Sequence, residues 1–166
     1  MIGTIDALFH PVISVSDMAE AVHFYRDLLG MTVTFDDYHD PAAIRSLFGY
    51  REPIVHAVVV GCPDGSEIEL VEFEQPRGRD DLARDPADAG LMAVNLRVTG
   101  IEAIVDRLNA AGYEPSSAIV PQDLPDGGRI KVVVCRAPDR VRILLVELPP
   151  GRASLAGPAA EMAGNE

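Results

Sequence analysis

The sequence predicts an α+β fold in which two βαβββ modules form a half-open β-barrel cup. Two observations support this: the same order of strand-like and helix-like segments occurs in both halves of the chain, and each half ends in two strands joined by a Pro-Asp turn. A sheet that one helix covers leaves its other face for a partner or a ligand. We expect a single domain over 1–148, made of module one (5–74), a linker (75–90) and module two (91–148), followed by a flexible tail (149–166).

Module one begins with an alternating segment, 8–15, which is typical of a strand. Asp17 followed by Glu20 is a helix-capping pattern, and the helix that it starts is expected to end at Gly30. After this helix we expect three strands and, before the second of them, a short helix within the polar stretch 38–52. The three strands are expected over 31–37, 54–61 and 66–73.

Module two repeats this order. Thr99 with Glu102 is a second capping pattern, and Gly112 is expected to end the helix. The alternating and apolar segments around this helix predict strands over 91–98, 113–120, 129–135 and 141–147.

Charge and composition exclude several classes of protein. The formal net charge of -12 would repel a polyphosphate, so we expect no nucleic-acid partner. No apolar run reaches the roughly 18 residues of a membrane span, and the N-terminus lacks the basic segment and long apolar core of a signal peptide. We therefore expect a cytoplasmic protein without a membrane partner, whose two cysteines, Cys62 and Cys135, are buried reduced thiols.

Strand alternation assigns side chains to the sheet faces. Phe9, Ile13 and Val15 are expected under the first helix, and Glu72 and Glu147 at strand ends on the helix side of their sheets. His23 and His39 are expected at the surface, although the 38–52 segment could lie over the cup as a lid. Polar side chains on an otherwise apolar cup face either form hydrogen bonds within the protein, contact water at the rim of the cup, or have a function. The candidates are His10, Ser14, His56, Glu69, Asn95, Arg97, Arg129 and Lys131.

The segment from His10 to Gly30 contains a strand, an Asp-initiated helix, Phe24-Tyr25 and a Leu-Gly end. It resembles the opening of proteins of the vicinal oxygen chelate (glyoxalase/bleomycin resistance/dioxygenase) superfamily, and the turn before Glu69 resembles the turn before that family's last strand. The resemblance covers residues 5–148 and implies a glyoxalase-like fold, a small organic ligand and a homodimer. Because the superfamily contains isomerases, epimerases, lyases, dioxygenases and drug-binding resistance proteins, the fold alone does not give the activity.

The resemblance also implies the position of a divalent metal, which family enzymes hold with one side chain from the first and one from the fourth strand of each module. His10 and Glu69 occupy the two positions in module one, whereas module two has Ala93 and Leu144, which cannot bind a metal. Catalytic sites ordinarily keep three protein ligands. We therefore expect no cofactor; a divalent metal, if one binds, would be held by His10 and Glu69 with help from substrate oxygens or a second chain.

Without a metal, the candidate residues predict acid–base chemistry. Glu69 would act as the base and His10 as proton donor or orienter, while a basic side chain (Arg97, Arg129 or Lys131) binds a carboxylate, enolate or phenolate oxygen. The expected activity is isomerisation, epimerisation, cyclisation or elimination on a carbonyl-containing metabolite. The alternative is a non-catalytic protein that binds a drug or metabolite, in which the His–Glu pair is only a structural contact.

Overall fold

The protein folds as two compact units, Met1–Ala83 and Arg84–Glu166, and each is described here by itself. The boundary between them lies within the predicted linker 75–90. The computed structural model describes residues 5–79, 86–87, 90–152 and 154–155. Parts of the predicted linker and most of the predicted tail therefore lie outside the described residues.

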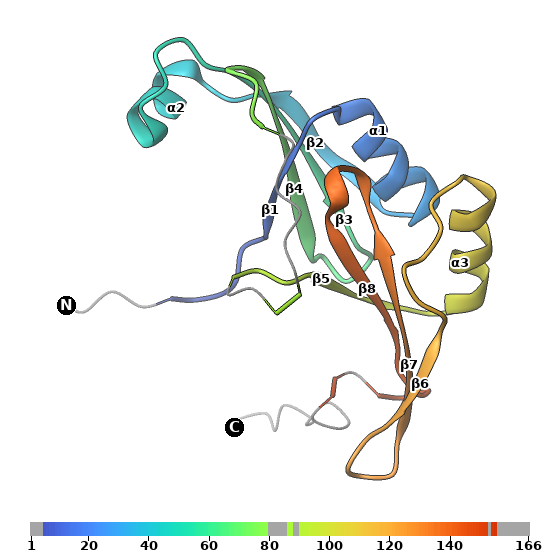
Figure 1. Ribbon diagram of the computed structural model, residues 1–166. Coiled ribbons are helices and arrows are strands. Elements are labelled where there is room, and N and C mark those ends of the chain that lie inside the picture. Colours follow the sequence, from blue (N-terminus) through green and yellow to red (C-terminus); the bar gives the residue numbers. More distant parts are fainter. Residues whose placement is uncertain (1–4, 80–85, 88–89, 153, 156–166) are drawn as a thin grey trace, which may run out of the picture. The chain divides into compact units, whose positions relative to one another are not determined.

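The first unit is built around a four-stranded mixed sheet (Figure 1). Its strands are β1 (Val12–Val15), β2 (Thr32–Tyr38), β3 (Ile54–Gly61) and β4 (Glu67–Gln75). They lie in the order β1-β4-β3-β2, with β1 and β4 parallel and the other pairs antiparallel. The helical segments are α1 (Met18–Val22), its continuation as the π-helix η1 (His23–Leu28), and α2 (Pro41–Phe48).

The α1–η1 helix forms where the sequence predicts it. The Asp17 side chain accepts a hydrogen bond from the Glu20 N–H at 3.0 Å, which caps the first turn. Buried Phe24, Tyr25 and Leu28 then cover one face of the sheet, where Ile13 and Val15 of β1 are also buried. Phe9 does not join them, because β1 begins only at Val12 and the Phe9 side chain is 82% exposed.

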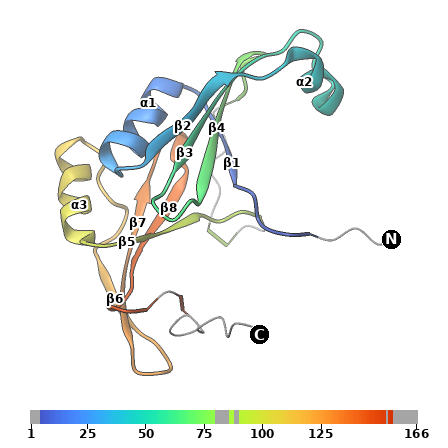
Figure 2. The same ribbon diagram turned by 180° about the vertical axis from the view of Figure 1, so that it is seen from behind.

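The second unit repeats the arrangement around another four-stranded sheet (Figure 2). In chain order its elements are β5 (Val94–Val98), α3 (Ile101–Ala110), β6 (Val120–Asp123), β7 (Arg129–Arg136), the 3-10 turn η2 (Pro138–Arg140) and β8 (Arg142–Glu147). The strand order is β5-β8-β7-β6, the equivalent of the first sheet. Both modules are therefore present, each with its helix inserted after the first strand.

The strand expected over 113–120 is shorter than predicted, because β6 begins at Val120. Before that residue, the chain is held to β7 by isolated bonds instead of a continuous ladder, one of them from Arg136 Nε to the Ser116 hydroxyl at 3.2 Å. The Ser116 N–H donates to the Val134 carbonyl at 2.7 Å, and the Val134 N–H donates to the Ser117 hydroxyl at 3.1 Å. A serine side chain thus replaces a backbone acceptor here.

A carboxylate on the last strand caps the first helix of each unit, within β4 in the first unit and at the end of β8 in the second. Glu72 of β4 accepts a hydrogen bond from the Met18 N–H at 3.0 Å, and Glu147 of β8 accepts from the N–H groups of Gly100 and Ile101. The expected Thr99 cap is wrong: Gly100 is the N-cap residue, and no side chain of its own caps the helix. Both glutamates lie on the helix side as predicted, but Glu72 is not at a strand end, and both act as long-range caps instead of free surface residues.

Two smaller expectations concern the membrane and the cysteines. No helix among the described residues is long and apolar enough to cross a membrane. Both cysteines are free thiols, but only Cys135 is buried, and burial raises the pKa of its thiol to about 11. Cys62 is half-buried.

Candidate functional site

The face of the first sheet that α1 leaves uncovered carries the candidate site, and we call it the open face. The register places on it Val12 and Ser14 of β1, Val55, Ala57 and Val59 of β3, and Glu69, Val71 and Phe73 of β4. These side chains are almost all apolar. Glu69 is therefore a carboxylate on a hydrophobic surface, a position that requires polar partners.

Two histidines supply these partners. His10 Nε2 lies 3.3 Å from Glu69 Oε2, and His39 Nε2 lies 3.0 Å from Glu69 Oε1. Each oxygen of the carboxylate thus contacts a different imidazole. The side chains of His10 and Glu69 are 12% and 14% exposed, whereas that of His39 is 37% exposed. We call these three residues the His–Glu–His trio.

His10 is held in place immediately before β1. The Glu69 N–H donates to the Pro11 carbonyl at 3.0 Å, which fixes the His10 backbone beside β4. The Phe9 ring stacks on the imidazole with the centroids 4.2 Å apart. His10 Nδ1 is buried and has no hydrogen-bond partner among the described residues. The structure therefore brings His10 and Glu69 together, as alternation predicts.

His39 is partly exposed, as expected of a surface residue, but its ring also contacts Glu69, so it belongs to the site. Its N–H donates to the Val55 carbonyl at 2.9 Å, which continues the β2–β3 ladder beyond Tyr38. A β-bulge decides the side chain's direction: Val33 pairs with Val60 of the helix side, whereas Phe35 pairs with Val59 of the open face. The bulge moves the odd-numbered residues that follow onto the open face. Simple alternation through 31–37 does not reveal such a bulge, so no sequence signal identified His39.

Ala57 makes the contact between His39 and Glu69 possible. Ala57 pairs with Val71. Along β3 it lies two residues from Val59, which pairs with Glu69, and two residues from Val55, whose carbonyl bonds to the His39 N–H. The line from position 39 to position 69 therefore crosses β3 at Ala57. Its side chain is a single methyl group, fully buried, and leaves room for both longer side chains to meet above it.

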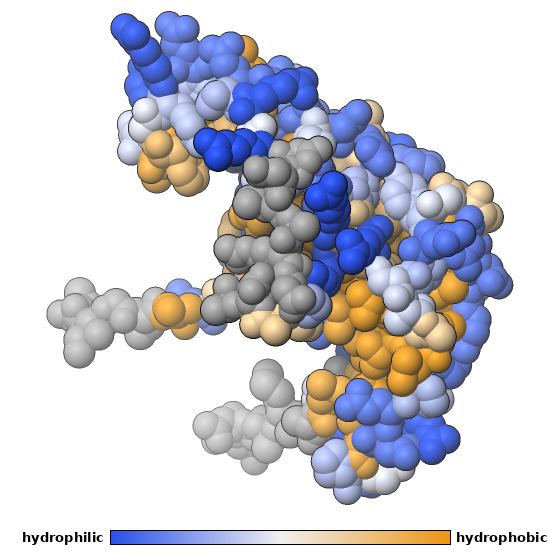
Figure 3. All heavy atoms as spheres, viewed as in Figure 1, coloured by the Kyte–Doolittle hydropathy of each residue, from blue (hydrophilic) through white to orange (hydrophobic). Residues whose placement is uncertain are grey.

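Helix α2 covers one end of the open face, as the lid expectation for 38–52 suggested. Ile44 packs in one cluster with Val55, Val71 and Phe73. The rings of Phe48 and Tyr50 meet Phe73 edge-on, with centroids 6.5 and 5.5 Å apart. Phe48 remains largely exposed, and apolar side chains are visible at the surface of this helix (Figure 3). An apolar, ring-lined surface therefore borders the trio.

His56 does not lie on the open face, and this expectation is corrected. Its expected place on the Glu69 side requires the even-numbered residues of β3 to share a face with Glu69, whereas the structure pairs Val59 with Glu69 and so places the odd-numbered residues there. A slip of one residue moves every side chain of a strand to the other face. His56 therefore lies opposite Glu72, where Nε2 contacts Asp36 Oδ1 at 2.7 Å and the ring stacks on Tyr38.

The same one-residue difference in register applies to the second unit, so Lys131 and Arg129 do not lie on the face where they were expected. Lys131 pairs with Glu147 on the α3 side, and its Nζ contacts Glu102 Oε1 at 2.6 Å and Glu147 Oε2 at 3.1 Å. Its hydrogen bonds to these two carboxylates raise the pKa of Lys131. Arg129 is ion-paired with Asp123 at 2.6 Å, an interaction that lowers the pKa of that carboxyl. Neither cation reaches the open face of its sheet.

The remaining candidates lie on the faces where they were expected. Ser14 is exposed and lies opposite Val71 on the open face of the first sheet. Asn95 and Arg97 are exposed on the face of the second sheet away from Glu147, opposite Leu144 and Val146. Their role in substrate binding stays a prediction.

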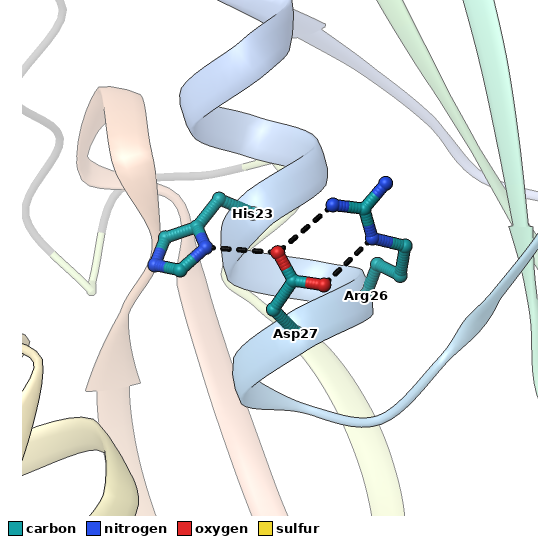
Figure 4. Close-up of polar contacts among 3 residues, drawn as sticks. All are labelled: His23, Arg26 and Asp27. Atoms are coloured by element: carbon teal, nitrogen blue, oxygen red, sulfur yellow. Dashed lines mark hydrogen bonds and ion pairs between the residues drawn. The ribbon is translucent and has the colours of Figure 1, made fainter.

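His23 is a surface residue, as expected, and takes part in a separate polar cluster on η1 (Figure 4). Its Nδ1 lies 2.9 Å from Asp27 Oδ2, while Arg26 donates to both oxygens of the same carboxylate at 2.7 and 2.9 Å. The hydrogen bonds from Arg26 and His23 hold the pKa of Asp27 well below its usual range. This exposed pairing provides a histidine–carboxylate contact outside the site.

Comparison with known proteins gives the family. The model of the glyoxalase/bleomycin resistance protein/dioxygenase superfamily matches residues 7–145. The chain belongs to this superfamily. It is 27% identical over 150 residues to a lactoylglutathione lyase-like protein, terB, of Aspergillus terreus, with 86% of this chain and 76% of that protein covered.

Solved structures of the superfamily show the same fold. A glyoxalase family protein from Bacillus cereus superposes with a TM-score of 0.76 at 20% identity, covering 88% of this chain and 96% of the other. A glyoxylase/bleomycin resistance protein/dioxygenase domain from Frankia sp. EAN1pec gives 0.62 at 19% identity, covering 88% and 100%. At these identities the likeness establishes the fold and not the activity.

The donor set of this superfamily member does not fit the metal centre that the family resemblance implies. His10 and Glu69 hold two of the four ligand positions, but Ala93 and Leu144 at the other two have no donor atoms. His39 does not replace them, because it and His10 are directed at separate oxygens of one carboxylate. Among the described residues, no group of three or more His, Cys, Asp or Glu side chains could hold a metal ion.

Proposed function

We propose that the protein is a metal-independent enzyme that moves a proton on a small carbonyl-containing molecule, with Glu69 as the base. The observation that carries this proposal is the Glu69 carboxylate on an apolar face with an imidazole at each oxygen. A carboxylate oxygen has two lone pairs, so each oxygen retains one that can take a proton from a substrate. An apolar surrounding also strengthens the electrostatic interactions of a bound reactant.

The reaction class is isomerisation, epimerisation, cyclisation or elimination. In each of these, a base removes a proton from carbon beside a carbonyl group, and the charge moves to the carbonyl oxygen. The name of the A. terreus relative, a lactoylglutathione lyase-like protein, supports chemistry of this kind. The apolar face and the rings of Phe48, Tyr50 and Phe73 favour a neutral, ring-containing substrate.

The second candidate function is non-catalytic binding of a drug or metabolite. The same rings favour it, because Phe48 and Tyr50 offer aromatic surface at the edge of the open face. In such a protein the His–Glu–His trio would hold the open face together and would bind a ligand without reacting. The two functions differ in whether a proton leaves the ligand.

Two neutral aromatic probes test the proposal. One is 5-nitrobenzisoxazole, whose ring opens when a base removes its C–H proton; the other is 2-tetralone, whose protons beside the carbonyl exchange with D2O. The wild type should accelerate both reactions, and Glu69→Gln should lower both rates by about 100-fold or more, because the amide has the same shape but does not take a proton. Absorbance and NMR follow the two reactions.

A matched control is Glu74→Gln, which makes the same change on the same strand at an exposed residue bonded to Tyr38. Its rates should equal those of the wild type. A wild type that accelerates neither probe, or a Glu69→Gln variant with full rates, would overturn the proposed enzyme. Retention of 2-tetralone by the wild type without exchange would support the binding protein.

Removal of divalent cations should leave both rates unchanged, because the trio needs no metal to take up a proton. The measurement compares protein dialysed against EDTA with protein supplied with Zn²⁺, Mn²⁺ or Mg²⁺. A rate that disappears with EDTA and returns with one equivalent of a cation would contradict metal independence.

We also infer that the protein acts as a homodimer in the cytoplasm on a small organic ligand. This inference rests on the superfamily and on the absence of a membrane-crossing helix among the described residues. Sedimentation equilibrium of the full chain tests the dimer.

A further inference from the structure

The three members of the trio differ in their access to a ligand. His10 has Nε2 on Glu69 and Nδ1 buried, so neither ring nitrogen is available to another molecule. His39 also has Nε2 on Glu69, but its side chain is 37% exposed, about three times as much as that of His10. His39 is therefore the histidine of the trio whose ring a ligand on the open face can meet, and Nδ1 is its ring nitrogen that does not contact Glu69.

The backbone of His39 is fixed on both sides although its ring is accessible. The His39 N–H bonds to the Val55 carbonyl at 2.9 Å, and the next residue, Asp40, caps α2 by accepting from the Ala42 N–H at 3.0 Å. The strand thus ends and the helix begins around this one residue. A side chain held in this way needs little reorganisation before it reacts.

We propose that His39 is a second catalytic residue, the general acid that gives a proton to the substrate, and that His10 is a positioning residue that holds Glu69. This inference rests on the proposed function and narrows it. A base and a separate acid on one face fit a substrate that loses a proton at one atom and gains one at another. The reaction class is therefore isomerisation of a carbonyl compound.

The proton transfers balance as follows. Glu69 as carboxylate takes a proton from carbon beside the carbonyl: the C–H bond breaks, an O–H bond forms on Glu69, and the electron pair moves into the enolate. His39 as imidazolium keeps its Nε2–H on Glu69 and gives the Nδ1 proton to the enolate at another atom. Glu69 then holds one proton more and His39 one fewer than at the start, and exchange with water restores both.

The two probes separate the roles of acid and base. Opening of 5-nitrobenzisoxazole needs only a base, because the nitro group stabilises the leaving phenolate. Exchange of 2-tetralone passes through an enolate; a general acid stabilises it by giving a proton to the oxygen, and the carbon then takes deuterium from Glu69 or D2O. The variant His39→Gln keeps a hydrogen-bond donor for Glu69 but cannot act as an acid. It should lower 2-tetralone exchange by about 100-fold and change 5-nitrobenzisoxazole opening by less than about threefold.

Two further variants complete the test. His23→Gln makes the same substitution in the exposed contact with Asp27 and should change neither rate. His39→Ala also removes the bond to Glu69, so it should lower both rates. If His39→Gln retains full exchange, or if it lowers both reactions equally, His39 acts only through Glu69 and the inference is wrong. A wild type inactive on both probes would instead remove the proposed function itself.

Discussion

Replacing Ala57 with leucine should lower proton transfer at Glu69 by about 100-fold, because a displacement of only about 1 Å in a reacting group can cost this much. The register places Ala57 on the line between His39 and Glu69, where its methyl group leaves room for their 3.0 Å contact. A leucine side chain would occupy that room and push the two groups apart. Exchange of 2-tetralone and opening of 5-nitrobenzisoxazole measure the loss.

The control for this prediction is Val58→Leu. Val58 is the next residue on β3 and is equally buried, but it points to the α1 side. Overpacking a core costs about 1–3 kcal/mol, so both variants should be less stable by a similar amount. Only Ala57→Leu should lose proton transfer. Equal rates in two folded variants would show that the space above Ala57 does not matter.

Replacing Glu147 with alanine should destabilise the second unit by about 2 kcal/mol. Its carboxylate accepts hydrogen bonds from the Gly100 and Ile101 N–H groups, and a hydrogen bond to a charged group contributes about 1.5–3 kcal/mol. Alanine would leave the first N–H groups of α3 and one contact of Lys131 without this partner. Urea unfolding followed by circular dichroism measures the change, and Glu147→Gln, which still accepts hydrogen bonds, should lose less.

The difference in the free energy of unfolding between the wild type and Glu147→Ala should become smaller in acid. Burial raises the pKa of Glu147, but the hydrogen bonds from Lys131, Gly100 and Ile101 lower it more, so the folded-state pKa lies below the ordinary value of 4.5. The stabilisation is then complete above pH 4.5 and disappears as the pH falls through the folded-state pKa. The free energies of unfolding of wild type and variant should therefore converge below that pH. A constant difference down to pH 2 would contradict this role.

The fold could be predicted from the sequence because its signals are local. Asp17 and Glu20 specify the start of α1, and the alternation over 54–61 gives β3 with its bounds unchanged. Because the order of segments repeats, the same elements could be predicted for the second unit. Strand alternation also places His10 and Glu69 on one face, since β1 and β4 contain no bulge between the residues that matter.

The rest of the site depends on register, which is set by contacts between strands. One residue of slip in the β3–β4 pairing moved His56 to the wrong face, and the repeat carried the same error to Lys131. The bulge between Val33 and Phe35 turned His39 inward. Neither feature has a signature in the residues themselves, because valine-rich strands such as β3 satisfy either register equally well.

The paired helix-capping glutamates separate what the repeat needs for folding from what the proposed reaction needs. Each unit has a glutamate that caps its first helix, Glu72 in the first unit and Glu147 in the second. Glu69, in contrast, has no acidic counterpart, because Leu144 occupies the equivalent position. Under the proposed function, the second unit supplies folding but no base, so substitutions on the Leu144 side of β8 should change ligand preference while leaving the base in place.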